Sequence, residues 1–143
     1  MSQGPIKLKL EPPDETVRAL HHHWGEVLSK LGLDEAPKKW LSNLELCVTE
    51  ALANALKHGQ PPSGPQPVWV TFTRIDGGVE VEIRDHGLEI QGFEERLRTL
   101  PDPLAESGRG LPLMGALMDR VTYKRTENEN RLTLFSLLST DTE

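Results

Sequence analysis

The sequence lacks the features that mark secreted and membrane proteins. It contains one cysteine, Cys47, so no disulfide can form within the chain, which fits a reducing compartment. No apolar run approaches the roughly 20 residues that a membrane-spanning helix requires. The start of the chain shows no charged region followed by an apolar stretch, as a signal peptide would. We therefore expect a cytoplasmic protein without a membrane partner.

The sequence also lacks an excess of basic residues. Sixteen Lys and Arg residues stand against 22 Asp and Glu residues, which gives a formal net charge of −6. This charge argues against direct binding to nucleic acid. The 36% of hydrophobic residues are enough for a core, and 143 residues is a common size for one domain. We expect a single domain over 1–143, with a core over about 6–139.

The spacing of apolar residues predicts five strands and three main helices. The predicted strands are 6–10, 68–72, 79–83, 121–123 and 132–135, and the last two are separated by a polar turn over 127–130. The predicted helices are 15–31, 35–58 and 108–118, with one or two further helical turns over 94–100. Strands and helices in this order predict an α+β fold, a two-layer sandwich with a mixed, mostly antiparallel sheet and helices on one face.

Local signals set the expected ends of these elements. Asp14 and Asp34 are each placed to cap the helix that follows, and Pro37 is tolerated in the first turn of the second helix. Gly59 is expected to end that helix. The sequence Asp-Gly-Gly at 76–78 predicts a hairpin between two strands.

The second predicted helix carries a polar stripe. Glu50, Asn54 and His58 are four residues apart and share one face, with Lys57 close to that face. A solvated helix surface produces the same pattern. Alanines on both sides of Asn54 favour a functional interpretation, because they allow close packing around the carboxylate and the amide.

Two glycine motifs follow the stripe. Asp85 and Gly87 come directly after a predicted strand, where an acid can accept a hydrogen bond from an exocyclic amine and a glycine lets a flat ligand approach. Gly108 and Gly110 open a predicted helix, where backbone amides favour an anion such as phosphate. Each motif alone is also typical of an ordinary turn or loop.

The three motifs together resemble the Bergerat-fold (GHKL) ATP site shared by gyrase, heat-shock chaperones, histidine kinases and MutL. Within that superfamily, the segments 49–59, 108–114 and 117–119 closely resemble the bacterial anti-sigma-factor serine kinases. The resemblance covers about 10–138, nearly the whole chain. It leaves no room for the dimerisation and phospho-acceptor helices of a complete histidine kinase.

The resemblance implies roles at the phosphate end of a nucleotide site. Asn54 would hold Mg²⁺ through its side-chain oxygen, and Glu50 would be the general base that accepts the proton of an attacking serine hydroxyl. Lys57 would lie near the phosphates. The cofactors implied are therefore ATP and Mg²⁺.

The resemblance also implies how the base and the lid are formed. Asp85 would accept a hydrogen bond from the adenine amine, with Gly87 giving the base room. Gly108 and Gly110 would let the lid backbone wrap around the phosphates, and Arg109 would add positive charge there.

The implied function is that of an ATP-binding anti-sigma factor and serine-protein kinase, which phosphorylates an anti-sigma-factor antagonist and binds a sigma factor. Relatives act as dimers, and exposed strand edges would permit a homodimer here, although the sequence does not establish the oligomeric state. Two features depart from the family: Pro112 stands where a third glycine is common, and no Gly-Thr pair is evident around Glu129 and Asn130. Two alternatives therefore stay open. One is a non-catalytic, nucleotide-gated binding module, and the other is a detached histidine-kinase-type ATPase domain.

Overall fold

The computed structural model describes residues 4–12, 15–100, 102, 104 and 110–138 of the chain. The strands are β1 (Ile6–Leu10), β2 (Val68–Ile75), β3 (Gly78–Asp85), β4 (Arg120–Thr126) and β5 (Glu129–Leu137). The helices are α1 (Val17–Lys30), α2 (Lys38–His58), α3 (Phe93–Arg98) and α4 (Gly110–Leu117).

The strands form one sheet in the order β1-β2-β3-β5-β4. Each of the four strand pairs is antiparallel, so the α+β prediction is confirmed, while the described strands contain no parallel pair of the kind that a mixed sheet would have. The predicted β2–β3 hairpin is present, and its turn uses Gly77 at a φ of 75°, which favours glycine.

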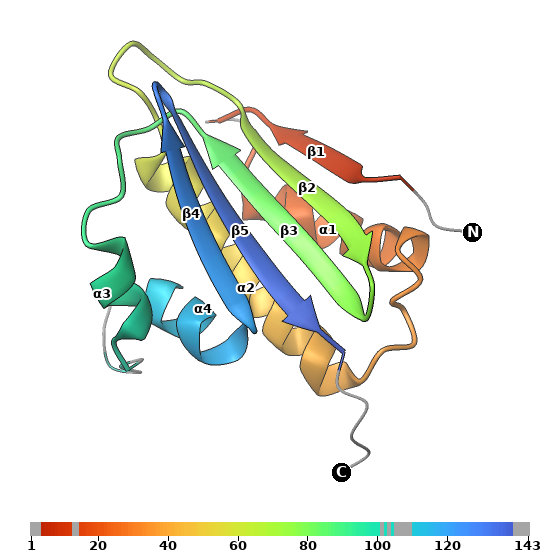
Figure 1. Cartoon of the computed structure of the whole chain (residues 1–143). Coiled ribbons are helices and arrows are strands. Elements are labelled where there is room, and N and C mark those ends of the chain that lie inside the picture. Colours follow the sequence, from red (N-terminus) through yellow and green to blue (C-terminus); the bar gives the residue numbers. More distant parts are fainter. Residues whose placement is uncertain (1–3, 13–14, 101, 103, 105–109, 139–143) are drawn as a thin grey trace.

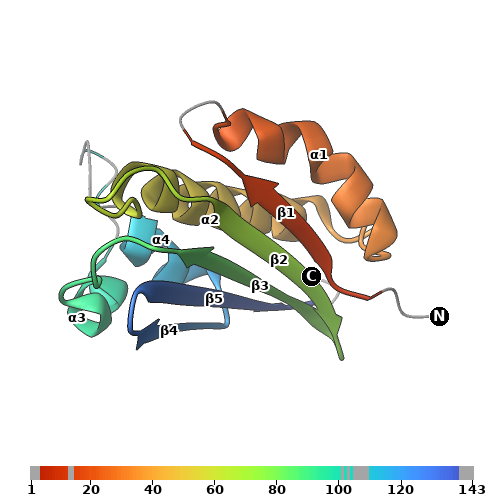
Figure 2. The ribbon, with the colours of Figure 1, turned by 90° about the horizontal axis from the view of Figure 1, so that it is seen from above.

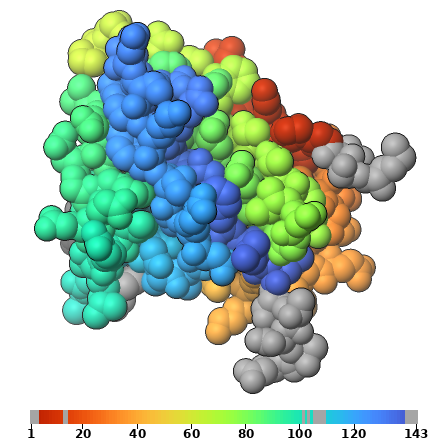
Figure 3. Space-filling view, in the orientation of Figure 1, coloured from red at the N-terminus to blue at the C-terminus, as the bar shows by residue number. Residues whose placement is uncertain are grey.

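The helices α1, α2 and α4 cover one face of this sheet, as the two ribbon views show (Figures 1 and 2). The opposite face, turned toward the viewer in Figure 3, has no helix over the described strands. The molecule is therefore the expected two-layer sandwich, with α2 running behind the central strands.

The core lies between the sheet and the helices. Period-two alternation turns Phe72, Val81 and Leu134 inward, and all three are buried. From the helical layer, Leu52 of α2 is fully buried, and Trp24 of α1 packs edge-on against Phe72 with ring centroids 6.1 Å apart. Burial of these side chains fixes α2 against the sheet, which in turn fixes the polar stripe of α2.

The helix starts differ from the predictions. Thr16 is the N-cap of α1 and accepts a hydrogen bond from the Arg18 amide, and Asp14 lies outside the described residues. Asp34 does not cap α2, which begins only at Lys38. The reason is that Pro37 adopts an extended conformation, with ψ at 136°, and so stands before the helix and not in its first turn. The predicted end at Gly59 is confirmed.

Several other boundaries shift because strand pairing extends beyond the apolar core positions. β2 continues to Ile75, and β5 begins at Glu129, so the turn between β4 and β5 is shorter than the predicted one. The helix α3 ends at Arg98, since Thr99 is extended. None of the helices in the described parts of the chain is both long and apolar enough to cross a membrane.

Candidate functional site

A cavity of about 430 Å³ opens between α2, the end of β3 and the segment that follows β3. Asn54 from the middle of α2 and Asp85 from the end of β3 both line it. The rest of the lining comes from α2, β3, the segment 88–91, α3, the start of α4 and β5, and includes Ala55, Leu88, Gln91, Arg96, Leu111 and Asn130. Two sequence-distant motifs therefore meet at one hollow.

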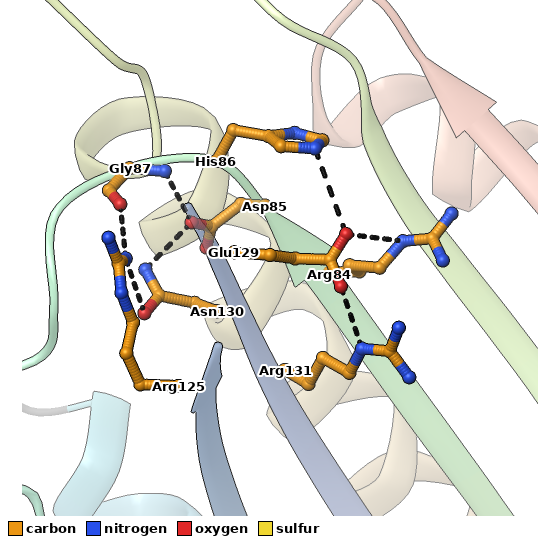
Figure 4. Close-up of polar contacts among 8 residues, drawn as sticks. All are labelled: Arg84, Asp85, His86, Gly87, Arg125, Glu129, Asn130 and Arg131. Carbon is orange, nitrogen blue, oxygen red and sulfur yellow. Dashed lines mark hydrogen bonds and ion pairs between the residues drawn. The ribbon is translucent and has the colours of Figure 1, made fainter. Parts of the chain in front are cut away.

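Asp85 is the most constrained acid of this cavity. The alternation of β3 turns it to the same face as Ile83, and its exposed fraction is only 8%. Its Oδ1 atom accepts hydrogen bonds from the Gly87 amide and from Asn130 Nδ2, each at 2.9 Å (Figure 4). The carboxylate is thus held in one orientation at the edge of the cavity.

Glycines let the end of α2 approach Asp85. A Cβ on Gly59 would lie 2.5 Å from Asp85 Cγ, and a Cβ on Gly87 would lie 2.5 Å from Gly59 Cα. Neither position tolerates a side chain without movement. Gly87 does not itself line the cavity; it supports Asp85 through its amide and packs on the end of α2.

The polar stripe of α2 divides between two surfaces. Asn54 faces the cavity, and Gly110 lies so close that a Cβ there would come within 2.7 Å of Asn54 Nδ2 and 3.7 Å of Glu50 Cβ. Glu50 therefore stands beside Asn54, one helical turn earlier. Lys57 is exposed and lines a different cavity, with Ala53 and Leu56, so the structure does not bring it to Asn54 and Asp85. Gly108 and Arg109 lie outside the described residues.

Cys47 lies one turn before Glu50 and faces the core. Burial, together with the neighbouring Glu50 carboxylate, raises the pKa of its thiol to about 12. Because the thiol stays protonated near neutral pH, Cys47 is a core residue and not a nucleophile of this site.

Sequence reasoning missed Asn130. It is 2% exposed, pairs with Asp85 across β3 and β5, and contacts Tyr123 and Arg125 of β4. The polar residues over 127–130 predict a turn there, whereas Asn130 belongs to β5. The signal that would have found it is the alternation with Leu132 and Leu134, which turns Asn130 inward once β5 is extended to Glu129.

The residues of the cavity fit a nucleotide with a magnesium ion. A fixed carboxylate can accept from a base amine, and the Asn54 side-chain oxygen is a ligand type that Mg²⁺ accepts. The described residues hold no cluster of three or more His, Cys, Asp or Glu able to bind a metal ion by themselves. A magnesium ion here would therefore depend on phosphate oxygens for further ligands, as is usual for this ion.

A family model described as the histidine kinase-like ATPase domain matches residues 10–135. The chain belongs to this family. Three relatives within the histidine kinase-like ATPase domains are named as anti-sigma factors or as a serine/threonine-protein kinase. The chain is 33% identical over 90 residues to the anti-sigma F factor of Priestia megaterium, covering 60% of this chain and 61% of that protein. It is 35% identical over 85 residues to the anti-sigma F factor of Bacillus licheniformis, covering 57% and 58%.

The third relative is the serine/threonine-protein kinase BtrW of Bordetella bronchiseptica, 33% identical over 100 residues, with 65% of this chain and 68% of that protein covered. The chain spans about three fifths of the length of the anti-sigma F factors. At the family level, these relatives confirm the resemblance to anti-sigma-factor kinases among the histidine kinase-like ATPase domains.

A solved structure confirms the fold. The crystal structure of the RsbU and RsbW domains of a Mycobacterium tuberculosis protein superposes with a TM-score of 0.69 at 18% identity, covering 97% of this chain and 34% of that one. At this identity, the likeness concerns the arrangement of strands and helices, which is that of the Bergerat-fold ATPases.

Proposed function

We propose that this chain binds Mg·ATP, transfers the γ-phosphate to a serine of an anti-sigma-factor antagonist, and also binds a sigma factor. The observation that carries the proposal is the meeting of Asn54 and Asp85 at one cavity of about 430 Å³. Family membership supports ATP binding, and relatives named as anti-sigma factors and as a protein kinase support the regulatory role.

The adenine end of the proposed site is at Asp85. Its carboxylate is held by the Gly87 amide and by Asn130, and it accepts the exocyclic amine of the base. Apolar side chains such as Ile83 and Leu132 line the same cavity and offer surfaces to the flat base. Gly87 contributes to this end indirectly, because its lack of a side chain lets the end of β3 pack closely against the end of α2.

The phosphate end is at Asn54 and Glu50. Asn54 offers its side-chain oxygen to a magnesium ion, which when bound neutralises phosphate charge. Glu50, one turn earlier on α2, accepts the proton of the attacking serine hydroxyl. Gly108, Arg109 and Gly110 keep the lid role that the family resemblance implies, in which backbone amides and one guanidinium would contact the phosphates. Lys57 is left out of the site because it lines another surface.

The names of the relatives, anti-sigma F factor and serine/threonine-protein kinase, support two kinds of partner. An antagonist protein with an accessible serine is the phosphate acceptor, and a sigma factor is the second partner. A chain that engages a sigma factor must act in the cytoplasm, where transcription occurs. A homodimer is part of the same proposal.

The test incubates the purified chain with γ-labelled ATP, Mg²⁺ and a candidate antagonist. We expect acid-stable label on the antagonist, because phosphoserine survives acid. Glu50→Gln is expected to abolish transfer and leave nucleotide affinity within about twofold, since the base acts on the proton and not on binding. Glu45→Gln is the matched control on the same helix, where Glu45 pairs with the exposed His21, and it should retain transfer.

The outcomes separate the alternatives. ATP binding without transfer to any candidate antagonist would identify a non-catalytic, nucleotide-gated module. Acid-labile label would indicate histidine as the acceptor and a detached histidine-kinase-type domain. Absence of ATP binding at millimolar concentration would overturn the proposal as a whole.

A further inference from the structure

Asn130 lines the cavity, yet its side-chain amide makes all of its hydrogen bonds to other groups of the protein. Its Nδ2 atom donates to Asp85 Oδ1 at 2.9 Å and to the Leu88 carbonyl at 2.8 Å. Its Oδ1 atom accepts from the Tyr123 hydroxyl at 2.6 Å and from Arg125 Nη1 at 3.1 Å. A carboxamide has two protons to donate and two lone pairs to accept with, so Asn130 has no further group for a ligand.

The orientation of this amide is decided by chemistry. The guanidinium of Arg125 can only donate, so the atom facing it must be the oxygen. The carboxylate of Asp85 accepts, so the atom facing it must be the nitrogen. Figure 4 shows the result: Asn130 stands between Arg125 and Asp85, with its two ends directed at opposite partners.

The network also holds the segment that forms the cavity wall after β3. Arg125 donates to the Gly87 carbonyl, and Asn130 donates to the Leu88 carbonyl. The Tyr123 hydroxyl accepts from the Ile90 amide at 2.9 Å. Three backbone positions of the segment after β3, two of which line the cavity, are thus tied to β4 and β5 through side chains that meet at Asn130.

We propose that Asn130 is a positioning residue for base selection: it fixes the Asp85 carboxylate so that one oxygen is committed to the protein and the other is presented to the base. The proposal rests on the ATP site described above. Both hydrogen bonds that the described residues give to Asp85 end on Oδ1, which leaves Oδ2 as the acceptor for an exocyclic amine.

A fixed acceptor discriminates between bases that differ only at that position. ATP carries an amine there, whereas ITP carries a carbonyl oxygen, which cannot donate to Asp85. We expect the wild-type chain to bind ATP at least about tenfold more tightly than ITP, because a buried acceptor left without a donor loses about that much. A carboxylate that is free to turn, or that takes up a proton, loses this selectivity.

The deciding variant is Asn130→Asp, which keeps the acceptors for Tyr123 and Arg125 but places a second carboxylate against Asp85. Binding of ATP and ITP is measured by calorimetry for each protein. We expect the ATP preference to fall to within about threefold, through weaker ATP binding and little change for ITP. Asn128→Asp makes the same chemical change at an exposed position of the β4–β5 turn, and it should keep the wild-type preference.

Tyr123→Phe provides a second measurement if Asn130→Asp fails to fold. It removes the hydroxyl that contacts Asn130 and the Ile90 amide, and it keeps the ring that packs on Phe93 at 5.2 Å between centroids. We expect a smaller drop in preference, about two- to threefold, with thermal unfolding confirming a folded protein.

The results distinguish this inference from the proposed function. If the wild type prefers ATP and both folded variants keep that preference, or if ATP and ITP weaken equally, Asn130 has only a structural role and the inference is wrong. If the wild type binds no ATP, the ATP site itself is wrong and the inference falls with it.

Discussion

Asn54 and Gly110 stand so close that the missing side chain of the glycine is what leaves room for the amide. A Cβ on Gly110 would lie 2.7 Å from Asn54 Nδ2. The start of α4 therefore packs closely against the middle of α2 at this point. The sequence gives the two residues as parts of separate motifs. The structure shows that the second glycine of the lid motif limits the position of the proposed magnesium ligand.

Gly110→Ala is therefore expected to displace the Asn54 carboxamide and weaken Mg²⁺-dependent ATP binding by about tenfold. Stability should change little, because the atom that must move is the end of a side chain. Titration of ATP with and without Mg²⁺ measures the effect. Gly25→Ala on α1 is the control, since its Cβ would meet no atom within 4 Å, and it should leave binding unchanged. Equal affinity for wild type and Gly110→Ala would contradict the prediction.

Gly87→Ala should act on stability. Its Cβ would lie 2.5 Å from Gly59 Cα and 2.7 Å from the His58 carbonyl oxygen, both backbone atoms that cannot turn away. We expect a loss of about 2 kcal/mol or more in the free energy of unfolding, measured by urea denaturation. A midpoint equal to that of the wild type would show that α2 and β3 separate more easily than their contacts indicate.

Lys57→Ala tests which part of the α2 stripe belongs to the site. Lys57 is exposed and lines the neighbouring cavity, so we expect ATP affinity to change by no more than about threefold, the range of a screened surface charge. Asn54→Ala should lower Mg²⁺-dependent affinity by more than about tenfold. A larger loss of ATP affinity in Lys57→Ala than in Asn54→Ala would show that Lys57 belongs to the phosphate end of the site.

Cys47 predicts a pH dependence. Its pKa is about 12 in the folded chain against 9.0 for an unperturbed thiol, so above pH 9 the unfolded chain loses the thiol proton while the folded chain keeps it. Because the folded state then binds more protons, the free energy of unfolding should fall as pH rises from about 9 toward 12. Urea denaturation over this range, compared with Cys47→Ala, measures the effect. The free energy of unfolding should change with pH at different slopes in the wild type and in Cys47→Ala. Equal slopes would show that Cys47 is not the cause of the pH dependence.

Thiol labelling offers an independent check on the same residue. Cys47 is fully buried, so a thiol reagent at pH 8 should label it in urea but not in buffer. Rapid labelling of the native protein would show that this part of α2 opens.

Much of the fold could be predicted from local patterns. Period-two alternation gave β2 and β3, and the Asp-Gly-Gly sequence gave their hairpin, because both depend on residues adjacent in the chain. The start of α2 was missed, since the conformation of Pro37 depends on the turn that precedes it. The start of β5 was missed because Glu129 and Asn130 are polar, and only pairing with β3 and β4 makes them strand residues.

The sequence by itself determined the chemistry available to this protein: a carboxylate and an amide on one helix stripe, an acid after a strand, and glycines where backbone must come close. Tertiary structure decided which of these groups meet. Asn54 and Lys57 are three positions apart on α2, and their side chains do not point in the same direction. Asn54 therefore faces the cavity, while Lys57 lines a different one. The register of β3 on β5 sets Asn130 beside Asp85, 45 residues away. Local alternation indicates which side chains of a strand point inward, but the register depends on packing between distant segments, so no local pattern states which residue of β3 Asn130 meets.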